Sequence, residues 1–282
     1  MSDADTDEVL QLLHEVAADV VLPRWRALAE HEIIEKNPGD LVTVADREAE
    51  VAITRWLRDR NPDALIVGEE ACSADPLLLR SLPQAEHAFT VDPVDGTKNF
   101  VRGSPDFGVM VAELRGGLTV RAWIWQPVHR IAIVAERGSG ARRYDPSGCM
   151  TLRCPPAPSE HQRWRLATSA YRLRGRSPNG LPALVGSWVS CAIDYPHLVA
   201  GDATALLFGR AMPWDHAAGT LVVTESGGVV THLDGRPYLP TDLPDRPTPW
   251  QQWLLASLGH RAHEPIRTAL ATELGGWLRS LG

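Results

Sequence analysis

The sequence has little of what zinc-binding, nucleic-acid-coating or membrane-spanning proteins need. Its four cysteines, Cys72, Cys149, Cys154 and Cys191, lack paired-ligand spacing, which argues against zinc and fits a reducing compartment. A formal net charge of −7 argues against a basic nucleic-acid-binding face. No hydrophobic run approaches the roughly 20 residues that span a bilayer, and the acidic residues 1–5 lack a signal-peptide pattern. We therefore expect a cytoplasmic protein that binds neither nucleic acid nor membrane.

Length and composition suit an enzyme with a large core. The chain has 282 residues and 44% of them are hydrophobic, so it can bury a substantial core in one large domain or two lobes. Residues 7–28 predict a helix that Pro23 kinks or divides. Residues 44–59 predict a clearer helix, because apolar residues such as Ala49 and Ile53 recur there at helical spacing.

Strands and helices alternate along the rest of the chain, which predicts a mixed α/β (α+β) protein. In the first half, apolar or alternating runs predict strands at 64–67, 87–91, 107–114, 119–125 and 131–136, the last three as an antiparallel meander. A proline-rich stretch at 154–159 is expected to link a lobe of residues 1–153 to a lobe of residues 154–282. In residues 154–282, apolar runs predict strands at 164–169, 203–208, 229–233 and 253–257. Helices are expected at 190–200, around Asp215 and from about 263, and a surface loop is expected at 239–249.

The most informative run is Asp-Pro-Val-Asp-Gly-Thr at 92–97, where two carboxylates follow a predicted strand. We expect that strand to end as Asp92 begins, because Pro93 bars regular continuation of a central strand. Asp92 and Asp95 lie close enough to repel unless a cation sits between them. Gly96 permits close backbone approach, and N–H groups from residue 96 onward would face an anion such as phosphate if they open a helix. Taken alone, the run also fits a solvated turn or a Ca²⁺ loop.

Two further acidic segments favour a metal site. Glu69 and Glu70 follow the predicted strand at 64–67, and Asp215 opens an apolar stretch that is expected to be helical. Carboxylates at the ends of hydrophobic elements can converge on one point, and hard oxygen ligands favour Mg²⁺. Asp46 has a structural alternative, because Thr43 and Asp46 have the spacing of a capping box with aspartate in place of glutamate.

These segments resemble the inositol monophosphatase family, within the Mg²⁺-dependent, lithium-sensitive phosphatases. The matching segments occur in the expected order: Lys36 with 40–46, then 68–70, 92–100 and 214–219. The resemblance implies a layered αβαβα sandwich of two lobes, like that of inositol monophosphatases and sugar phosphatases, often assembled as a homodimer. It also implies a reaction on a small phosphorylated metabolite.

The resemblance implies a role for each matching residue. Glu69, Asp92 and the carbonyl of Val94 would hold a first Mg²⁺, and Glu69 would help to hold a weaker third ion. The second ion would lie among Asp92, Asp95 and Asp215. Thr97 and Asp46 would orient the attacking water, and Glu69 would draw its proton. Gly96 and Thr97 would contact the phosphate. Substrate contacts are expected from Lys36, Cys191 and Phe208.

The physical chemistry of phosphoryl transfer agrees with this assignment. Two divalent ions about 3.5–4 Å apart lower the pKa of a bound water and clamp both attacking and leaving oxygens. Positioning and charge neutralisation then carry the reaction. No cysteine or histidine nucleophile is needed, so we predict direct attack by water without a phosphoenzyme.

The substrate is less closely defined by the sequence. In family members that act on inositol phosphates, a glutamate seven residues before the last metal-binding aspartate contacts sugar-alcohol hydroxyls, and here that position is Phe208. A phenyl ring accepts no hydroxyl hydrogen bond. The alternatives to an inositol monophosphate as substrate are therefore histidinol phosphate, 3′-phosphoadenosine 5′-phosphate and fructose 1,6-bisphosphate. Arg172, Arg174 and Arg176 are candidates for a second anionic group or a solvated loop. His216 is expected to pack away from the metals. A non-catalytic phosphometabolite-binding protein is the alternative from another functional class.

Overall fold

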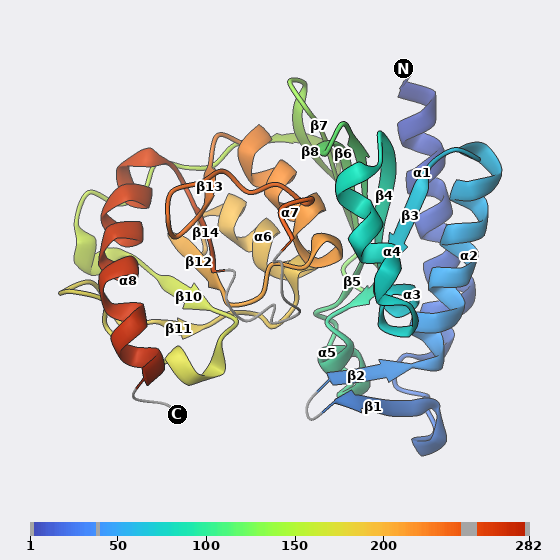
Figure 1. The fold of residues 1–282 in the computed structure, drawn as a ribbon, viewed down its shortest axis with the longest axis horizontal. Helices are drawn as coiled ribbons and strands as arrows, with labels where there is room; N and C mark the ends of the chain where they lie inside the picture. The colour runs from blue at the N-terminus through green and yellow to red at the C-terminus, as the bar shows by residue number, and fades with distance from the viewer. Residues whose placement is uncertain (1–2, 38–39, 244–252, 280–282) are drawn as a thin grey trace.

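Helices and sheets alternate in five layers in the computed structural model, which describes residues 3–37, 40–243 and 253–279 (Figure 1). Helices α1 (Asp3–Val16) and α2 (Val44–Arg60) cover one face of a seven-stranded sheet. Helices α6 (Cys191–Ala200) and α7 (Pro213–Glu225) lie between that sheet and a five-stranded sheet, and α8 (His260–Arg279) covers the outer face. The αβαβα sandwich expected from the sequence is confirmed.

The seven-stranded sheet has the order β3-β4-β5-β6-β7-β8-β9. Strands β3 and β4 are parallel, and every later pair is antiparallel. The strands are β3 (Leu65–Gly68), β4 (His87–Asp95), β5 (Gly108–Arg115), β6 (Leu118–Gln126), β7 (Ile131–Glu136), β8 (Gly140–Asp145) and β9 (Gly148–Leu152). The predicted meander is thus present and is extended by β8 and β9, which the sequence did not predict.

Strand β4 corrects one prediction about the acidic run. The strand does not end before Asp92 but continues to Asp95. Its pairing with β5 shifts between Asp92, opposite Met110, and Asp95, opposite Gly108. Three residues of β4 thus span two of β5, a bulge that accommodates the missing N–H of Pro93. The bulge keeps both aspartates on a strand and re-aims the chain between them.

The five-stranded sheet has the order β11-β10-β12-β14-β13. Its strands are β10 (Leu166–Thr168), β11 (Val185–Gly186), β12 (Ala205–Phe208), β13 (Val229–His232) and β14 (Leu254–Ser257). The predicted strands of this half are present within a few residues, and α8 begins three residues earlier than expected. The predicted loop at 239–249 lies partly outside the described residues. The sheets change between β9 and β10, where the two-lobe boundary was predicted, but the division into lobes remains a prediction.

The N-terminal helix is shorter than residues 7–28. After α1 the chain forms a π-helical turn (Ala17–Val21) and a 3₁₀ turn (Leu22–Arg24). Trp25 is extended, and Arg26 has a φ of 62°, which ends the helical stretch. The chain also forms short elements that the sequence did not predict: β1 (Ile33–Asn37), β2 (Asp40–Thr43), α3 (Glu69–Ala74), α4 (Pro76–Ser81) and α5 (Thr97–Val101).

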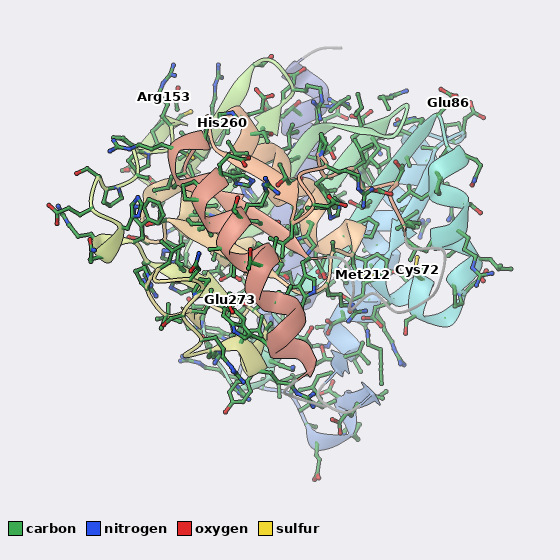
Figure 2. All side chains as sticks on the ribbon, turned by 60° about the vertical axis from the view of Figure 1, so that its left-hand side comes forward. Cys72, Glu86, Arg153, Met212, His260 and Glu273 are labelled. Carbon is green, nitrogen blue, oxygen red and sulfur yellow. The ribbon has the colours of Figure 1, made fainter. Side chains whose placement is uncertain are left out.

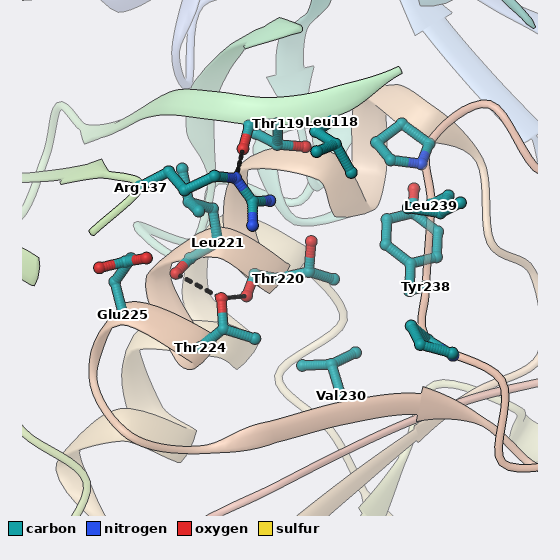
Figure 3. A pocket seen from close by; sticks show the side chains of 12 residues that line it. Leu118, Thr119, Arg137, Thr220, Leu221, Thr224, Glu225, Val230, Tyr238 and Leu239 are labelled. Atoms are coloured by element: carbon teal, nitrogen blue, oxygen red, sulfur yellow. Dashed lines mark hydrogen bonds between the residues drawn. The ribbon is translucent and has the colours of Figure 1, made fainter. Parts of the chain in front are cut away.

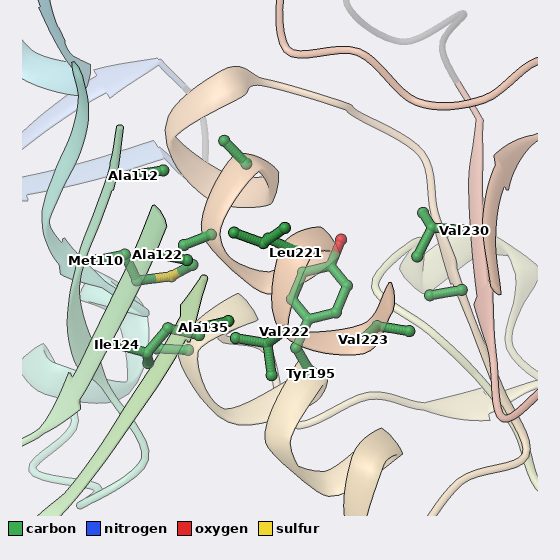
Figure 4. Close-up of a cluster of buried hydrophobic side chains, with 14 of the residues drawn as sticks. Met110, Ala112, Ala122, Ile124, Ala135, Tyr195, Leu221, Val222, Val223 and Val230 are labelled. Carbon is green, nitrogen blue, oxygen red and sulfur yellow. The ribbon is translucent and has the colours of Figure 1, made fainter. Parts of the chain in front are cut away.

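An apolar core joins the seven-stranded sheet to the middle helices (Figure 4). Met110 and Ile124 of the sheet face Leu221 and Val222 of α7 in this cluster. The cluster crosses the predicted lobe boundary, because it includes Cys72, while Met212 packs against it. Both of these side chains are labelled in Figure 2. No helix of the described residues is long and apolar enough to cross a membrane.

Close contact between α6 and α7 requires a glycine. A Cβ added at Gly219 would lie 1.9 Å from Cδ2 of Tyr195, which is fully buried. The Tyr195 hydroxyl is 2.7 Å from Nδ1 of His216, which fixes the ring. Since Asp215 lies one helical turn before Gly219, this contact also sets the position of the site carboxylate.

Candidate metal centre and active site

Three of the predicted metal ligands converge from three different elements. Glu69 begins α3 directly after β3, Asp92 lies in β4 before the bulge, and Asp215 lies in the first turn of α7. Each offers a carboxylate oxygen, and these oxygens lie within 4.8 Å of one another. Parallel pairing of β3 with β4 brings Glu69 beside Asp92. The structure therefore gathers these carboxylates as the sequence indicated.

The buried charge of this cluster fits a hard cation. Asp92 is only 2% exposed, and its Oδ1 is buried without a hydrogen-bond partner. Burial raises the pKa of Asp92 well above its usual range, and the charges of Glu69 and Asp95 raise it further. Burial likewise raises the pKa of Glu69 to about 8, with Asp215 adding to the shift. An unsatisfied oxygen among repelling carboxylates is the donor set that Mg²⁺ takes.

Asp95 lies outside this triad and is anchored to the second half of the chain. Its Oδ2 accepts a hydrogen bond from the Ser190 hydroxyl and another from the backbone N–H of Ala192 at 2.7 Å. Burial raises the pKa of Asp95, while the Ser190 and backbone hydrogen bonds oppose the shift. Asp95 thereby joins the β4 bulge to the start of α6.

Thr97 and Asp46 are in contact beside the triad. The Thr97 hydroxyl is 3.1 Å from Oδ1 of Asp46 and 3.1 Å from the carbonyl oxygen of Val94. Oδ2 of Asp46 accepts from the backbone N–H of Thr43 at 2.8 Å, so the predicted capping contact is also present. Burial raises the pKa of Asp46 to about 6, against the lowering effect of the Thr43 hydrogen bonds. One carboxylate therefore caps α2 with one oxygen and contacts Thr97 with the other.

Gly96 occupies a position that other residues would strain. Its φ is 88°, and an added Cβ would lie 2.9 Å from Cβ of Ser190. The glycine lets the chain turn from the β4 bulge into α5 while Ser190 approaches Asp95. The carbonyl oxygen of Gly96 accepts hydrogen bonds from the N–H groups of Asn99 and Phe100 in α5.

Lys36 reaches the triad from β1. Its Nζ lies 3.1 Å from Oε1 of Glu69 and 2.9 Å from Oε1 of Glu70. Although burial lowers the pKa of Lys36, the two glutamates outweigh it, and the pKa is raised. The ammonium group therefore offsets part of the negative charge of the cluster.

Glu50 is a site residue that the sequence reasoning missed. Its buried carboxylate accepts from the N–H groups of Glu70 at 2.7 Å and Ala71 at 2.8 Å. These bonds cap α3 at its first turn and so fix Glu69. A Cβ added at Gly68 would lie 2.3 Å from Cδ of Glu50, so the glycine makes room for the carboxylate. The available signal was an acidic residue four positions after Asp46, on the buried face of α2.

Phe208, Cys191 and His216 form a packed group behind Asp215. Phe208 is 1% exposed, and its ring lies 4.8 Å from the His216 ring and 5.1 Å from the Tyr195 ring. Nε2 of His216 contacts the carbonyl oxygen of Arg210 at 2.5 Å, which agrees with a packed histidine. Cys191 Sγ lies 4.0 Å from Nδ1 of His216. The structure thus places the Phe208 ring in the packed group behind Asp215, where it is not exposed to a substrate.

Arg174, a candidate for binding a second anionic group, and the thiol of Cys72 lie in other surroundings. The Arg174 guanidinium lies over the ring of the exposed Tyr171, 5.1 Å from its centroid, and against Gly186. Cys72 is buried, and burial raises the pKa of its thiol to about 12, which disfavours the reactive thiolate form.

A separate cavity lies between α7 and the loop after β13 (Figure 3). Its volume is about 270 Å³, and Arg137 and Tyr238 line it from opposite sides. Nε of Arg137 donates to the carbonyl oxygen of Thr119 at 2.7 Å. Thr220 and Thr224 line the floor on the part of α7 beyond Asp215.

The amino-acid sequence is similar to proteins of one known family. A model of the inositol monophosphatase family matches residues 4–271. The Nus factor SuhB of Pseudomonas aeruginosa is 32% identical over 231 residues, with 75% of this chain and 80% of that protein covered. A fructose-1,6-bisphosphatase/inositol-1-monophosphatase of Thermotoga maritima is 29% identical over 218 residues, with 72% of this chain and 76% of that protein covered.

Solved structures share the fold. The IMPase of Thermotoga maritima superimposes with a TM-score of 0.78 at 23% identity, with 97% of this chain and 99% of that chain covered. The extragenic suppressor protein SuhB of Bartonella henselae gives a TM-score of 0.75 at 25% identity, with 95% and 98% covered. The family match over nearly the whole chain, with the carboxylates brought together as described, shows that this chain belongs to the inositol monophosphatase family.

Proposed function

We propose that the protein is a Mg²⁺-dependent phosphomonoesterase that hydrolyses a small phosphorylated metabolite by direct attack of water. The observation that carries this proposal is the convergence of Glu69, Asp92 and Asp215 within 4.8 Å, with Oδ1 of Asp92 buried and unsatisfied. A folded protein rarely keeps a buried carboxylate oxygen without a partner unless a ligand supplies one. Family membership supports a phosphatase.

The residues that would hold Mg²⁺ are Glu69, Asp92 and Asp215, with Asp95 and the carbonyl of Val94 alongside. When bound, two or three Mg²⁺ ions would activate water and neutralise the charge of the phosphoryl group. Lys36 would move from its present pairing with Glu69 as the net charge of the cluster changes, because the ammonium and a cation compete for the same carboxylate.

Thr97, Asp46 and Glu69 would handle the attacking water. If Thr97 donates its hydroxyl hydrogen to Asp46, its oxygen is free to accept a hydrogen from water. Asp46 is held rigidly by Thr43, so the Thr97 oxygen is oriented before substrate binds. Glu69 would take one proton from the water as the water oxygen bonds to phosphorus, and this proton would pass to the alcohol oxygen as its P–O bond breaks. The backbone of Gly96 and Thr97 would contact the phosphate. The product would be inorganic phosphate and an alcohol.

The name of one relative supports a small phosphate ester as the substrate. The Thermotoga maritima relative is named for fructose 1,6-bisphosphate and inositol 1-monophosphate, both small phosphate esters. We favour an inositol monophosphate-like ester, with histidinol phosphate, 3′-phosphoadenosine 5′-phosphate and fructose 1,6-bisphosphate as alternatives. Homodimer assembly and a cytoplasmic location belong to the same proposal.

A non-catalytic binding role is the second candidate, because several relatives are named Nus factor SuhB. Because Nus factor names a role other than that of a phosphatase, the absence of a nucleic-acid partner stays a prediction for this chain. Phosphate release from the four esters, each with Mg²⁺ or EDTA, separates the two candidates. We expect Mg²⁺-dependent release from at least one ester, and its loss in Asp95→Asn protein that keeps its fold by circular dichroism. Activity that survives in EDTA or in the variant would contradict the proposed function.

A further inference from the structure

Buried polar atoms without partners gather beside Asp215. Among the described residues, Nε of Arg210 and the hydroxyl of Tyr238 are buried and make no hydrogen bond, as is true of Oδ1 of Asp92. Native proteins pair nearly all such groups, so each unpaired group calls for a ligand or another explanation. Asp92 is explained by a cation, but a cation cannot satisfy a guanidinium or accept the hydrogen of a tyrosine hydroxyl. These two donors need an acceptor.

Arg210 and Tyr238 both lie close to His216. Arg210 lies on the connection between β12 and α7, and its carbonyl oxygen contacts Nε2 of His216 at 2.5 Å. The Tyr238 ring comes from the chain after β13, with its centroid 6.3 Å from that of His216. Since His216 directly follows Asp215, both residues lie next to the helical turn that carries this site carboxylate.

Electrostatic effects agree with this placement. Burial raises the pKa of Tyr238, and the charge of Asp215 raises it further, as expected for a hydroxyl near that carboxylate. Burial lowers the pKa of His216 to about 4, and the positive charge of Arg210 contributes to that shift. The first effect agrees with a Tyr238 hydroxyl near Asp215, and the second with an Arg210 side chain near His216.

Arg210 also lacks a counter-charge. Across residues 3–37, 40–243 and 253–279, it forms no ion pair and no side-chain hydrogen bond. The stretch 208–212 contains no acidic residue, and Phe208 is buried behind His216. An unpaired, half-buried guanidinium favours carboxylate or phosphate as its partner.

We propose that Arg210 and Tyr238 form a subsite for a second anionic group carried by the alcohol part of the phosphomonoester substrate. This inference rests on the proposed function and names its substrate class. In this arrangement the reacting phosphate lies at the carboxylates and the second anion lies beside Asp215, near His216. Arg210 supplies charge and Tyr238 donates a hydrogen bond. An inositol monophosphate leaves both donors unpaired, so the subsite favours 3′-phosphoadenosine 5′-phosphate or fructose 1,6-bisphosphate, which carry a second anionic group, over the inositol ester.

Two esters that differ in one group test the subsite. Glycerol 2-phosphate and 2-phosphoglycerate differ by one hydroxymethyl group replaced by a carboxylate. We expect the wild-type protein to have a kcat/KM at least 10-fold higher for 2-phosphoglycerate, from charge-assisted hydrogen bonding. Arg210→Met should lower kcat/KM for 2-phosphoglycerate by about 10- to 100-fold and that for glycerol 2-phosphate by less than about 2-fold.

Two further variants serve as a graded test and a control. Tyr238→Phe removes only the hydroxyl, so we expect a loss of about 3- to 10-fold that is again confined to 2-phosphoglycerate. Arg163→Met replaces an exposed arginine of the turn before β10 and should change neither ester. Equal losses on both esters from Arg210→Met would assign the residue to folding or general catalysis and overturn the subsite.

Binding gives a readout that does not need turnover. In Asp95→Asn protein with Mg²⁺, calorimetry should show tighter binding of 2-phosphoglycerate than of glycerol 2-phosphate. Adding Arg210→Met should abolish the difference. Equal affinities for the two esters overturn the subsite, whether or not the wild-type protein releases phosphate. Phosphate release without preference between the esters also overturns it but leaves the proposed function standing.

Discussion

Replacing Gly219 with alanine should destabilise the protein by pressing α7 against α6. The new Cβ would lie 1.9 Å from Cδ2 and 2.3 Å from Cε2 of Tyr195. That ring has no room to move, because it is fully buried and its hydroxyl is bonded to His216. Overpacking of a core costs about 1–3 kcal/mol, and so severe an overlap should reach the upper end. The greater helix propensity of alanine offsets about 1 kcal/mol. The net loss is therefore about 2 kcal/mol.

Thermal unfolding gives a direct measurement of this effect. For a chain of this size, about 2 kcal/mol lowers the Tm by roughly 4–8 °C. Gly276→Ala is the matched control, because Gly276 also lies within a helix and nothing lies within 4 Å of an added Cβ. The control should raise the Tm by about 2–4 °C from helix propensity alone. If Gly219→Ala raised the Tm as Gly276→Ala does, the packing argument for α6 and α7 would be refuted.

Two other predictions follow from buried contacts. Gly68→Ala should displace the Glu50 carboxylate, because Cδ of Glu50 would lie 2.3 Å from the new Cβ. We expect Mg²⁺ affinity, measured by calorimetric titration, to fall about 10-fold. An unchanged affinity would show that Glu50 does not support the site. Burial lowers the pKa of His263 from 6.5 to about 4, and its ring bonds Ser257 and Thr231. The unfolded chain therefore takes up a proton that folded His263 does not, and stability should fall as the pH drops from about 6.5 to about 4. Urea unfolding of His263→Gln should show a weaker dependence over that range, and an identical dependence would exclude His263 as a source.

Regular periodic elements were predictable because one buried face repeats along the chain. The helix predicted at 44–59 appears as Val44–Arg60, with Ala49 and Ile53 fully buried. Strands β8 and β9 were not predictable in this way. Residues of β9 are mostly exposed, so no apolar alternation marks an edge strand whose order comes from backbone pairing with β8.

The candidate site was predictable where acidic residues follow apolar runs. The convergence of Glu69, Asp92 and Asp215 follows from their places at the ends of core elements. The continuation of β4 through Pro93 was not, since a bulge depends on the neighbouring strand. Ser190 was missed for a similar reason, because a lone serine far along the sequence carries no local sign that it will meet an aspartate.

Support around the site depends on tertiary contacts that single segments do not reveal. Glu50 reads as one of many charged residues on a helix until α3 is seen packed against it. Phe208 occupies a position expected to contact substrate, yet its ring is buried. The side chain of Arg210, two residues later, has no hydrogen-bond partner in the described part of the chain. The sequence does not distinguish this arginine from the others, because its position depends on packing around His216.

The central claim is that Glu69, Asp92 and Asp215 form a magnesium centre, and titration calorimetry of metal-free protein with Mg²⁺ tests it most directly. Asp92→Asn is the informative variant, because the buried Oδ1 of Asp92 has no partner in the protein. We predict saturable Mg²⁺ binding to the wild-type protein, and binding at least about 10-fold weaker in Asp92→Asn protein that keeps its fold. Equal Mg²⁺ binding by the two proteins, or none by the wild-type protein, would contradict the account.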